Sequence, residues 1–362
     1  MNASEFFAQS YSEARSKFQH AAHNAGLEVQ SFKHRLKGRH GEELAVDVVR
    51  VGPIDAQRLL IISSGCHGVE GFAGSGVQNA LLCDRLFHDR ACKANIAVLY
   101  LHALNPWGFS WWRRWTEDNV DLNRNFRDFS PGIELPANPG YSQLAHALVP
   151  ESWPCADADR TLWDYAAKYG MRGIETAIAS GQYSHPDGLF FGGHSPTWSN
   201  LVIRTILSEH CAQCSDLAWL DLHTATGPKG EATMVLMSPD EAGSLDRAQS
   251  WWGSGVTRLE HGDGPMVPRT GTMAIGTSEI FGRAQYTGVI LEFGTEDGVE
   301  VTNALRAAQW LDRQPHVEAT IRESIDQRIR DAFYTNTDSW KCSTVAQGID
   351  AASRAIAGIA HL

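Results

Sequence analysis

The chain has 362 residues, of which 43% are hydrophobic and 20% charged, as is typical of a globular protein with a substantial buried core. Its formal net charge of -11, without a cluster of Lys or Arg, argues against a nucleic-acid-binding surface, because phosphate binding needs concentrated positive charge. No apolar run approaches the roughly 20 residues that cross a membrane, so we expect a soluble protein without a membrane partner.

The N-terminal residues 1–26 are polar and predict a helix. They lack the basic start and apolar middle of a secretory signal, so we expect a cytoplasmic protein. The seven cysteines form no disulfide framework, which suits free thiols in a reducing compartment. Cys211 and Cys214 are the one close pair, and no second pair completes a zinc ribbon, so we assign them no role.

Short apolar runs predict buried strands of a mostly parallel sheet. These runs are residues 58–65, 95–104, 216–224 and 287–295. Predicted helices lie between or beside them, at 74–89, 199–214, 303–333 (broken at Pro315) and 344–362. This alternation favours an α/β sandwich, and the chain shows no internal repeat or linker. We therefore expect one domain over residues 1–362.

Residues 130–200 form a long insertion that is rich in Pro, Gly and aromatic residues. A connection of this length inside a compact domain is usually functional, as a lid or a binding wall, although its aromatic residues can equally just cover core. Near its end, Gln182, His185 and His194 are candidates for polar contacts with a substrate. The glycines around them can equally serve only tight turns.

His67 and Glu70 follow the first predicted strand, on a turn that leads into a helix. Ligands of open α/β folds collect at this carboxyl edge of the sheet, and His nitrogen and carboxylate oxygen are zinc ligands. Such a pair often occurs by chance, so a third ligand is needed. His223 offers one at the end of the strand 216–224, although a histidine there is often only a core residue. Asp221 lies on the same side of that strand and is placed to orient the ring of His223.

Glu292 lies in the middle of an otherwise apolar predicted strand, where an unpartnered carboxylate would cost several kcal/mol. We therefore expect it to face a cavity. Next to a metal, such a glutamate can take a proton from the attacking water and pass it to a leaving amine. Arg113, Arg114, Asn123 and Arg124 lie between these motifs, and clustered arginines beside a metal suggest an anionic substrate group. For Arg113 and Arg114, surface salt bridges are the alternative.

Taken in order, these motifs resemble the zinc carboxypeptidase clan, which includes carboxypeptidase A-like enzymes and the aspartoacylase and succinylglutamate desuccinylase group. The sequence looks most like a bacterial branch of that clan. The motifs span roughly residues 58–295 and are His67-x-x-Glu70, Asn105-Pro106-Trp107-Gly108, DLNRNF at 121–126, Asp221-Leu222-His223 and Glu292.

The resemblance implies a three-layer α/β/α sandwich around a mixed, roughly eight-stranded sheet. It also implies one zinc ion per chain, held by His67, Glu70 and His223. The bound zinc would lower the pKa of a water toward about 7.

By the same likeness, Asn123 and Arg124 would grip a substrate carboxylate and Glu292 would be the catalytic glutamate. One of Arg113 and Arg114 would steady the oxyanion, a use for which preorganised positive charge is suited.

The sequence departs from the digestive carboxypeptidases in two ways. The connection between the Asn-Arg pair and the last histidine is longer, and Tyr286 is too close to Glu292 to match their mobile tyrosine. The insertion is therefore expected to narrow the pocket, so that a small amide enters as in the deacylase-like branches.

We expect a zinc-dependent hydrolase that cleaves an amide bond in a small peptide or an N-acyl amino acid with a carboxylate. The alternatives are an esterase and a non-catalytic, metal-containing binding protein of the same fold. A serine hydrolase built on Ser195 fits poorly, because GGHSPT lacks the final glycine of a nucleophile elbow and follows no strand.

Overall fold

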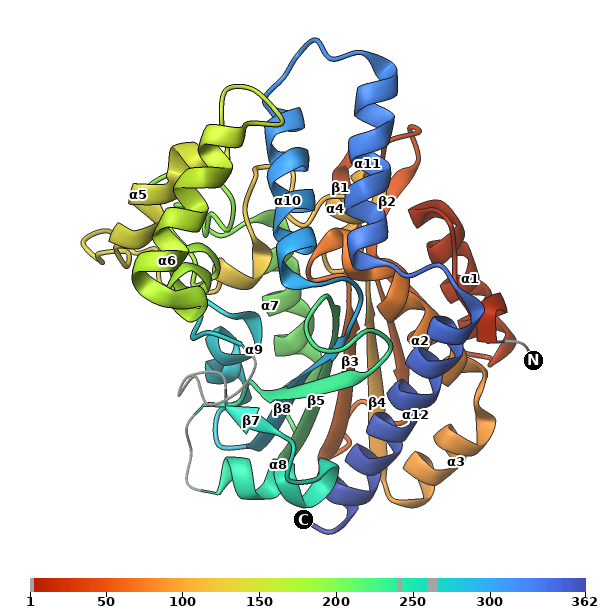
Figure 1. The fold of residues 1–362 in the computed structure, drawn as a ribbon. Helices are drawn as coiled ribbons and strands as arrows, with labels where there is room; N and C mark the ends of the chain where they lie inside the picture. Colours follow the sequence, from red (N-terminus) through yellow and green to blue (C-terminus); the bar gives the residue numbers. More distant parts are fainter. Residues whose placement is uncertain (1–2, 240–242, 259–265) are drawn as a thin grey trace.

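The computed structural model describes residues 3–239, 243–258 and 266–362. Its described residues include a mixed sheet of eight strands (Figure 1). The strand order across the sheet is β1-β2-β4-β3-β5-β8-β6-β7. The strands are β1 (Gln30–Lys37), β2 (Glu43–Val51), β3 (Arg58–Ser64), β4 (Ile96–His102), β5 (Asp216–Thr224), β6 (Ala232–Leu236), β7 (Thr257–Arg258) and β8 (Gln285–Phe293).

The centre of the sheet consists of the four predicted strands. β4, β3, β5 and β8 are parallel neighbours, and nearly all of their residues are buried, as expected of strands covered on both faces. Antiparallel pairing of β2 with β4 and of β6 with β8 makes the sheet mixed. The mixed, eight-stranded sheet that the resemblance implies is therefore confirmed.

Helices cover both faces of the sheet, which gives three layers (Figure 1). The helices are α1 (Tyr11–Asn24), α2 (Gly71–Cys83), α3 (Arg85–Lys93), α4 (Pro106–Trp111), α5 (Pro139–Leu148), α6 (Ala156–Ala179), α7 (Trp198–Cys211), α8 (Ser244–Trp252), α9 (Met273–Gly276), α10 (Gly298–Asp312), α11 (Ala319–Phe333) and α12 (Asp338–Ala360). Successive strand residues point to opposite faces. Leu60 and Ile62 pack with α1, α2 and α12, whereas Leu59 and Ile61 pack with α7.

The helix predicted at residues 74–89 is two helices, α2 and α3, that meet at Asp84. The backbone of Asp84 is not helical, with φ -88 and ψ 88, and its carboxylate accepts a hydrogen bond from the N–H of Phe87. Asp84 therefore caps α3 and ends the first helix. The predicted break near Pro315 is confirmed, because it falls between α10 and α11. α1 lies within the predicted helical segment 1–26, whose first two residues lie outside the described residues.

The insertion at 130–200 contributes α5 and α6, which lie beside α10 in Figure 1. Leu144 of α5 and Ile178 of α6 belong to a hydrophobic cluster with Leu305 of α10 and Ile329 of α11. Val69 joins the same cluster from the 3-10 turn Gly68–Glu70, which follows β3. The insertion is thus packed against the turn that carries His67 and Glu70.

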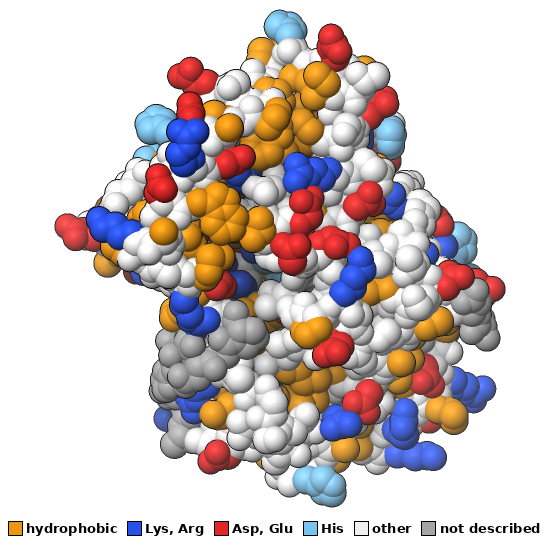
Figure 2. All heavy atoms as spheres, in the orientation of Figure 1, with side chains coloured by type: hydrophobic (Ala, Val, Ile, Leu, Met, Phe, Trp, Pro, Cys, Tyr) orange, Lys and Arg blue, Asp and Glu red, His pale blue; other side chains and the backbone are white. Residues whose placement is uncertain are grey.

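None of the helices in the described segments is long and apolar enough to cross a membrane. On the face drawn in Figure 2, Lys and Arg side chains are interspersed with Asp and Glu. That face therefore shows no concentrated positive charge of the kind that binds nucleic acid.

Candidate metal centre

The carboxyl ends of β3 and β5 bring His67, Glu70 and His223 together. These strands are parallel neighbours in register, with Ser64 opposite Leu222. Beyond β3 the chain turns through a short 3-10 helix, Gly68–Glu70, and enters α2. A side chain at Gly68 would place its Cβ 2.1 Å from the carbonyl carbon of Gly108, so only glycine lets this turn pack against α4.

The donor atoms of the three side chains converge on one point. The Nδ1 atoms of His67 and His223 are 3.2 Å apart. Glu70 Oε1 is 2.8 Å from the first of these nitrogens, and Glu70 Oε2 is 3.1 Å from the second. Each of the three residues is only 1% exposed.

The other ring nitrogen of each histidine faces a carboxylate. His223 Nε2 lies 2.6 Å from Asp221 Oδ2. His67 Nε2 lies 3.2 Å from Asp121 Oδ1 and 2.7 Å from Arg114 Nη2. For His223, a carboxylate that accepts the Nε2 proton leaves Nδ1 of the neutral ring free to bind a metal. The predicted orientation of His223 by Asp221 is present in the structure.

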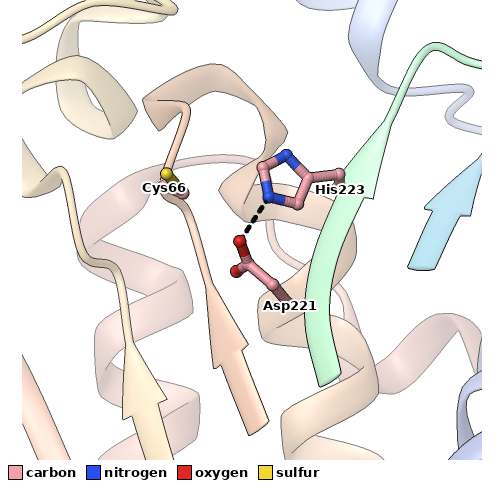
Figure 3. A group of neighbouring side chains, drawn as sticks. All are labelled: Cys66, Asp221 and His223. Atoms are coloured by element: carbon pink, nitrogen blue, oxygen red, sulfur yellow. Dashed lines mark hydrogen bonds and ion pairs between the residues drawn. The ribbon is translucent and has the colours of Figure 1, made fainter. Parts of the chain in front are cut away.

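Figure 3 shows how β5 supplies this pair, with the Asp221 carboxylate turned to the His223 ring and Cys66 at the end of the neighbouring strand. Ser63 donates a hydrogen bond of 2.6 Å to Asp221 Oδ1 and accepts one of 2.7 Å from Trp219 Nε1. Cys66, Asp221 and His223 also lie close enough to form a second candidate ligand group. The Asp221 contact occupies His223 Nε2, so the ring's Nδ1 serves the first group.

The donor set fits zinc. Tetrahedral zinc with bonds of about 2.0 to 2.2 Å separates its ligand atoms by roughly 3.3 Å. The three separations between His67, Glu70 and His223 lie between 2.8 and 3.2 Å, so a small adjustment suffices. Three protein ligands of the His, Glu and His types are also the set found in catalytic zinc sites, where a fourth position stays open.

Charges around the three side chains keep the carboxylates ionised. Burial by itself raises the pKa of Glu70, but His67 and His223 outweigh it and lower that pKa below the usual value. Asp121 behaves alike, since Arg114 and Arg124 hold its pKa far below the usual range despite burial. Both groups are therefore anionic at neutral pH.

Glu292 lies beside the candidate ligands, directly opposite His223 in the pairing of β5 with β8. It is 3% exposed, and burial, followed by the neighbouring charge of Glu70, raises its pKa to about 7. The N–H of Thr226 donates a long hydrogen bond of 3.4 Å to its Oε2. A carboxyl group with a pKa near 7 can both take up and release a proton at neutral pH.

The structure separates the two neighbouring arginines. Arg114 points to the ligands, with Nη1 3.0 Å from Glu70 Oε1 and Nε 3.0 Å from Asp121 Oδ2. Arg113 points away, and its guanidinium pairs with Asp312 at 2.7 Å and with Asp326 at 2.8 Å. Arg113 thus joins the 111–117 loop to α10 and α11 and lies outside the group around the ligands.

Asn123 and Arg124 follow Asp121 on a short 3-10 helix, Leu122–Arg124. Arg124 donates to the backbone carbonyls of Asn123 at 2.6 Å and of Ala179 at 2.7 Å. Two buried donors of this pair, Asn123 Nδ2 and Arg124 Nε, have no hydrogen-bond partner. The ring of Phe190 lies over the Arg124 and Arg114 guanidiniums, with centroid distances of 5.9 and 5.2 Å.

The candidate contacts Gln182 and His185 lie in the loop that follows α6. Gln182 is fully buried, and its amide hydrogen bonds go to the backbone of Ser184, His185 and Leu189. His185 Nε2 lies 3.1 Å from Ser142 Oγ. His194 Nε2, similarly, lies 2.7 Å from the carbonyl of Tyr183. These side chains hold the loop together, and within the described residues none of their hydrogen bonds reaches His67, Glu70 or His223.

Three residues near the ligands were not identified as site residues from the sequence. Asp121 stands in the DLNRNF motif, and its position three residues before Arg124 could have indicated a role beside that arginine. Phe190 was one of several aromatic residues in the insertion. Arg269 stands in a segment without a recognisable pattern, and only the folded chain brings its charge to Glu292 and Arg124.

Residues 7–347 match a family model described as "Protein of unknown function (DUF2817)". A comparison with curated proteins found no match. Among solved structures, bovine thrombin-activatable fibrinolysis inhibitor is similar, with 12% identity, a TM-score of 0.50 and 98% of each chain covered. A carboxypeptidase A from Helicoverpa armigera shares 16% identity at a TM-score of 0.45, covering 90% of this chain and 74% of that one. At 12% identity the likeness to the first of these structures shows the fold alone, and the fold that the resemblance implies is confirmed.

Proposed function

We propose that this chain, which belongs to the DUF2817 family, is a zinc-dependent hydrolase of an amide bond in a small peptide or N-acyl amino acid. The observation that carries the proposal is the convergence of His67 Nδ1, His223 Nδ1 and the Glu70 carboxylate within 3.2 Å of one another, with Glu292 alongside. A metal alone would suit a binding protein. A second, proton-accepting carboxylate beside it suits catalysis.

His67, Glu70 and His223 would hold one zinc ion per chain. When bound, zinc supplies a Lewis acid for the carbonyl oxygen and lowers the pKa of an attacking water. Asp221 orients the His223 ring, and Asp121 and Arg114 contact the His67 ring, so that both Nε2 atoms lie away from the ligand point.

Glu292 acts as the proton carrier. Its carboxylate takes a proton from the water as the water attacks the amide carbonyl, and then gives that proton to the leaving nitrogen. Burial supports this role, because it raises the pKa of Glu292 to about 7, where a carboxyl group can both take up and release a proton at neutral pH.

Arg114 stabilises the oxyanion that develops on the carbonyl oxygen. It is 8% exposed and is already oriented by Glu70 and Asp121, so its charge needs no rearrangement during the reaction. Asn123 and Arg124 bind the substrate carboxylate. Their unpartnered buried donors, Nδ2 and Nε, are groups that an anionic ligand would satisfy.

Replacement of Glu292 by Gln tests the proposal, since the amide keeps the shape of the side chain but cannot carry the proton. We expect about one zinc per chain in Glu292→Gln and amine release from a panel of N-acetyl amino acids and dipeptides lowered by about 10²- to 10⁴-fold. Glu296→Gln, four residues further and partly exposed, is the matched control with wild-type turnover. Undiminished turnover in Glu292→Gln would refute the mechanism. A wild type that binds panel members without cleaving any would favour the binding protein instead.

A further inference from the structure

Arg269 lies on a segment that is fixed beside Arg124. The N–H of Thr270 donates to the carbonyl of Ser180 at 3.1 Å, and the N–H of Phe126 donates to the carbonyl of Gly271 at 3.0 Å. Gly271 has a left-handed backbone with φ +68, and a Cβ there would lie 2.2 Å from the carbonyl oxygen of Arg124. The backbone that carries Arg269 is therefore in direct contact with the proposed carboxylate-binding pair.

No described residue pairs with the Arg269 guanidinium. Its Nε is buried without a hydrogen-bond partner, and the side chain forms no ion pair within the described segments. Arg114 differs, because Glu70 and Asp121 both lie 3.0 Å from its guanidinium. A partly desolvated cation without a counter-ion is unfavourable, so an arginine in this position indicates an anion that comes from outside the chain.

The charge of Arg269 acts on the candidate site. Burial is the largest influence on Arg269 and lowers its pKa. Smaller influences come from the charges of Glu292, Arg114, Asp121 and Glu175. Conversely, Arg269 lowers the pKa of both Glu292 and Arg124. Arg269 is half-buried, whereas the ligands, Glu292 and Arg124 are each no more than 3% exposed. It is therefore the charged side chain of this group that solvent reaches most easily.

The charges around the site leave two guanidiniums without an ion pair. Asp121 and Glu70 pair with Arg114, and among the described residues no carboxylate lies within ion-pair distance of Arg124 or Arg269. Arg124 donates two hydrogen bonds to backbone carbonyls, and its remaining N–H groups suffice for about one carboxylate. Arg269 keeps all of its donors for another group.

We propose that Arg269 binds a second acidic group of the substrate, while Asn123 and Arg124 bind its first carboxylate. The inference rests on the proposed function, since it names the substrate class of the same site. The preferred substrate is then a small amide with two anionic groups. An arginine is suited to this selection, because its planar donors match a carboxylate and lose favourable contacts when an uncharged amide takes its place.

N-acetylglutamate and N-acetylglutamine test the inference, because they have nearly the same shape and differ by one charge. We expect kcat/KM of the full-length wild type to favour N-acetylglutamate by about tenfold to hundredfold, the usual worth of a charge-assisted contact. In Arg269→Gln this ratio should fall to near one. Arg283→Gln removes the same charge from an exposed site and should keep the wild-type ratio. A ratio near one in the wild type, or an unchanged ratio in Arg269→Gln, overturns the inference.

Equilibrium binding separates this inference from the proposed function. By calorimetry, the wild type should bind glutarate at least tenfold more tightly than butyrate, and Arg269→Gln should lose this preference. Arg269→Lys keeps the positive charge and should retain part of the preference for glutarate. This variant distinguishes loss of the charge from a folding defect. If the wild type prefers glutarate but cleaves no amide, the role of Arg269 stands and the proposed hydrolase function is refuted. If the wild type cleaves amides but has no preference for glutarate, the hydrolase function stands and the role of Arg269 is refuted.

Discussion

Arg113 and Arg114 are neighbours in the chain, yet the structure predicts opposite consequences of replacing them. Arg113 is 4% exposed and joins Asp312 and Asp326 through hydrogen bonds of 2.7 to 2.9 Å. We therefore expect Arg113→Met to lower the free energy of unfolding and to leave turnover per folded chain within a fewfold. Arg114→Met should instead lower turnover by about 10²- to 10³-fold, the loss typical of one oxyanion-stabilising donor.

The magnitude for Arg113 follows from what its removal leaves behind. Asp326 is 3% exposed and keeps only the ion pair with Arg39, at 2.8 Å. Asp312 is partly exposed and keeps a hydrogen bond from Trp115 Nε1. Breaking a buried ion pair costs about 3 to 5 kcal/mol, and because both carboxylates retain a partner we expect the lower end, about 3 kcal/mol.

Urea unfolding and steady-state kinetics on the same preparations measure the two effects. Arg313→Met is the matched control, because the contacts of Arg313 are long: its ion pair with Asp187 is 3.6 Å and its hydrogen bond to the Val149 carbonyl is 3.5 Å. A surface pair of this kind is worth about 0.5 kcal/mol. An Arg113→Met protein with wild-type stability, or one that is folded but has lost turnover as Arg114→Met does, would refute this separation of roles.

Two further predictions concern stability. His102 is fully buried and its pKa is lowered to about 4, chiefly by burial. Because the unfolded chain binds that proton near pH 6.5, His102 contributes a loss of stability as the pH falls, of roughly 2 kcal/mol between pH 7.5 and pH 5. Urea titrations at both values should show the wild type changing by this amount relative to His102→Gln, a difference from which the opposite contribution of Glu292 cancels. Gly271→Ala should destabilise the protein by more than about 2 kcal/mol and raise KM, since its Cβ would lie 2.2 Å from the Arg124 carbonyl oxygen.

Matched variants isolate each cause. His361→Gln, at the exposed C-terminus, should keep the wild-type pH slope, and an equal change in both variants would contradict the assignment to His102. Gly26→Ala has a similar positive φ of +72 but open space around its Cβ, so it should cost only about 1 to 2 kcal/mol of backbone strain. Equal losses at the two glycines would mean that the contact with Arg124 does not matter.

The central strands could be predicted from the sequence because strands buried on both faces are continuous apolar runs. β1 is mostly exposed and β7 has only two residues, so neither strand forms a continuous apolar run in the sequence. The helix break at Asp84 was missed for a related reason. An Asp inside an amphipathic pattern looks like a surface position, and only its bond to the Phe87 N–H shows that it is a cap.

The candidate ligands could be predicted because each stands next to a strand end, where parallel strands meet. The choice between Arg113 and Arg114 could not. It depends on the turn at Trp112, whose left-handed backbone (φ 57) ends α4 and sends the two following side chains in different directions. Arg269 could not be predicted either, since its place near Glu292 is set by long-range contacts of the 270–271 backbone.

The most direct test of the central claim is the metal content of the purified protein, by elemental analysis. We predict about one zinc per wild-type chain and less than a tenth of that in His67→Ala and in His223→Ala. His102→Ala, which removes a buried histidine away from these ligands, should keep the wild-type content. A wild type that holds no metal and cannot be loaded with any, or equal zinc in all four proteins, would contradict the claim that His67, Glu70 and His223 form a metal centre.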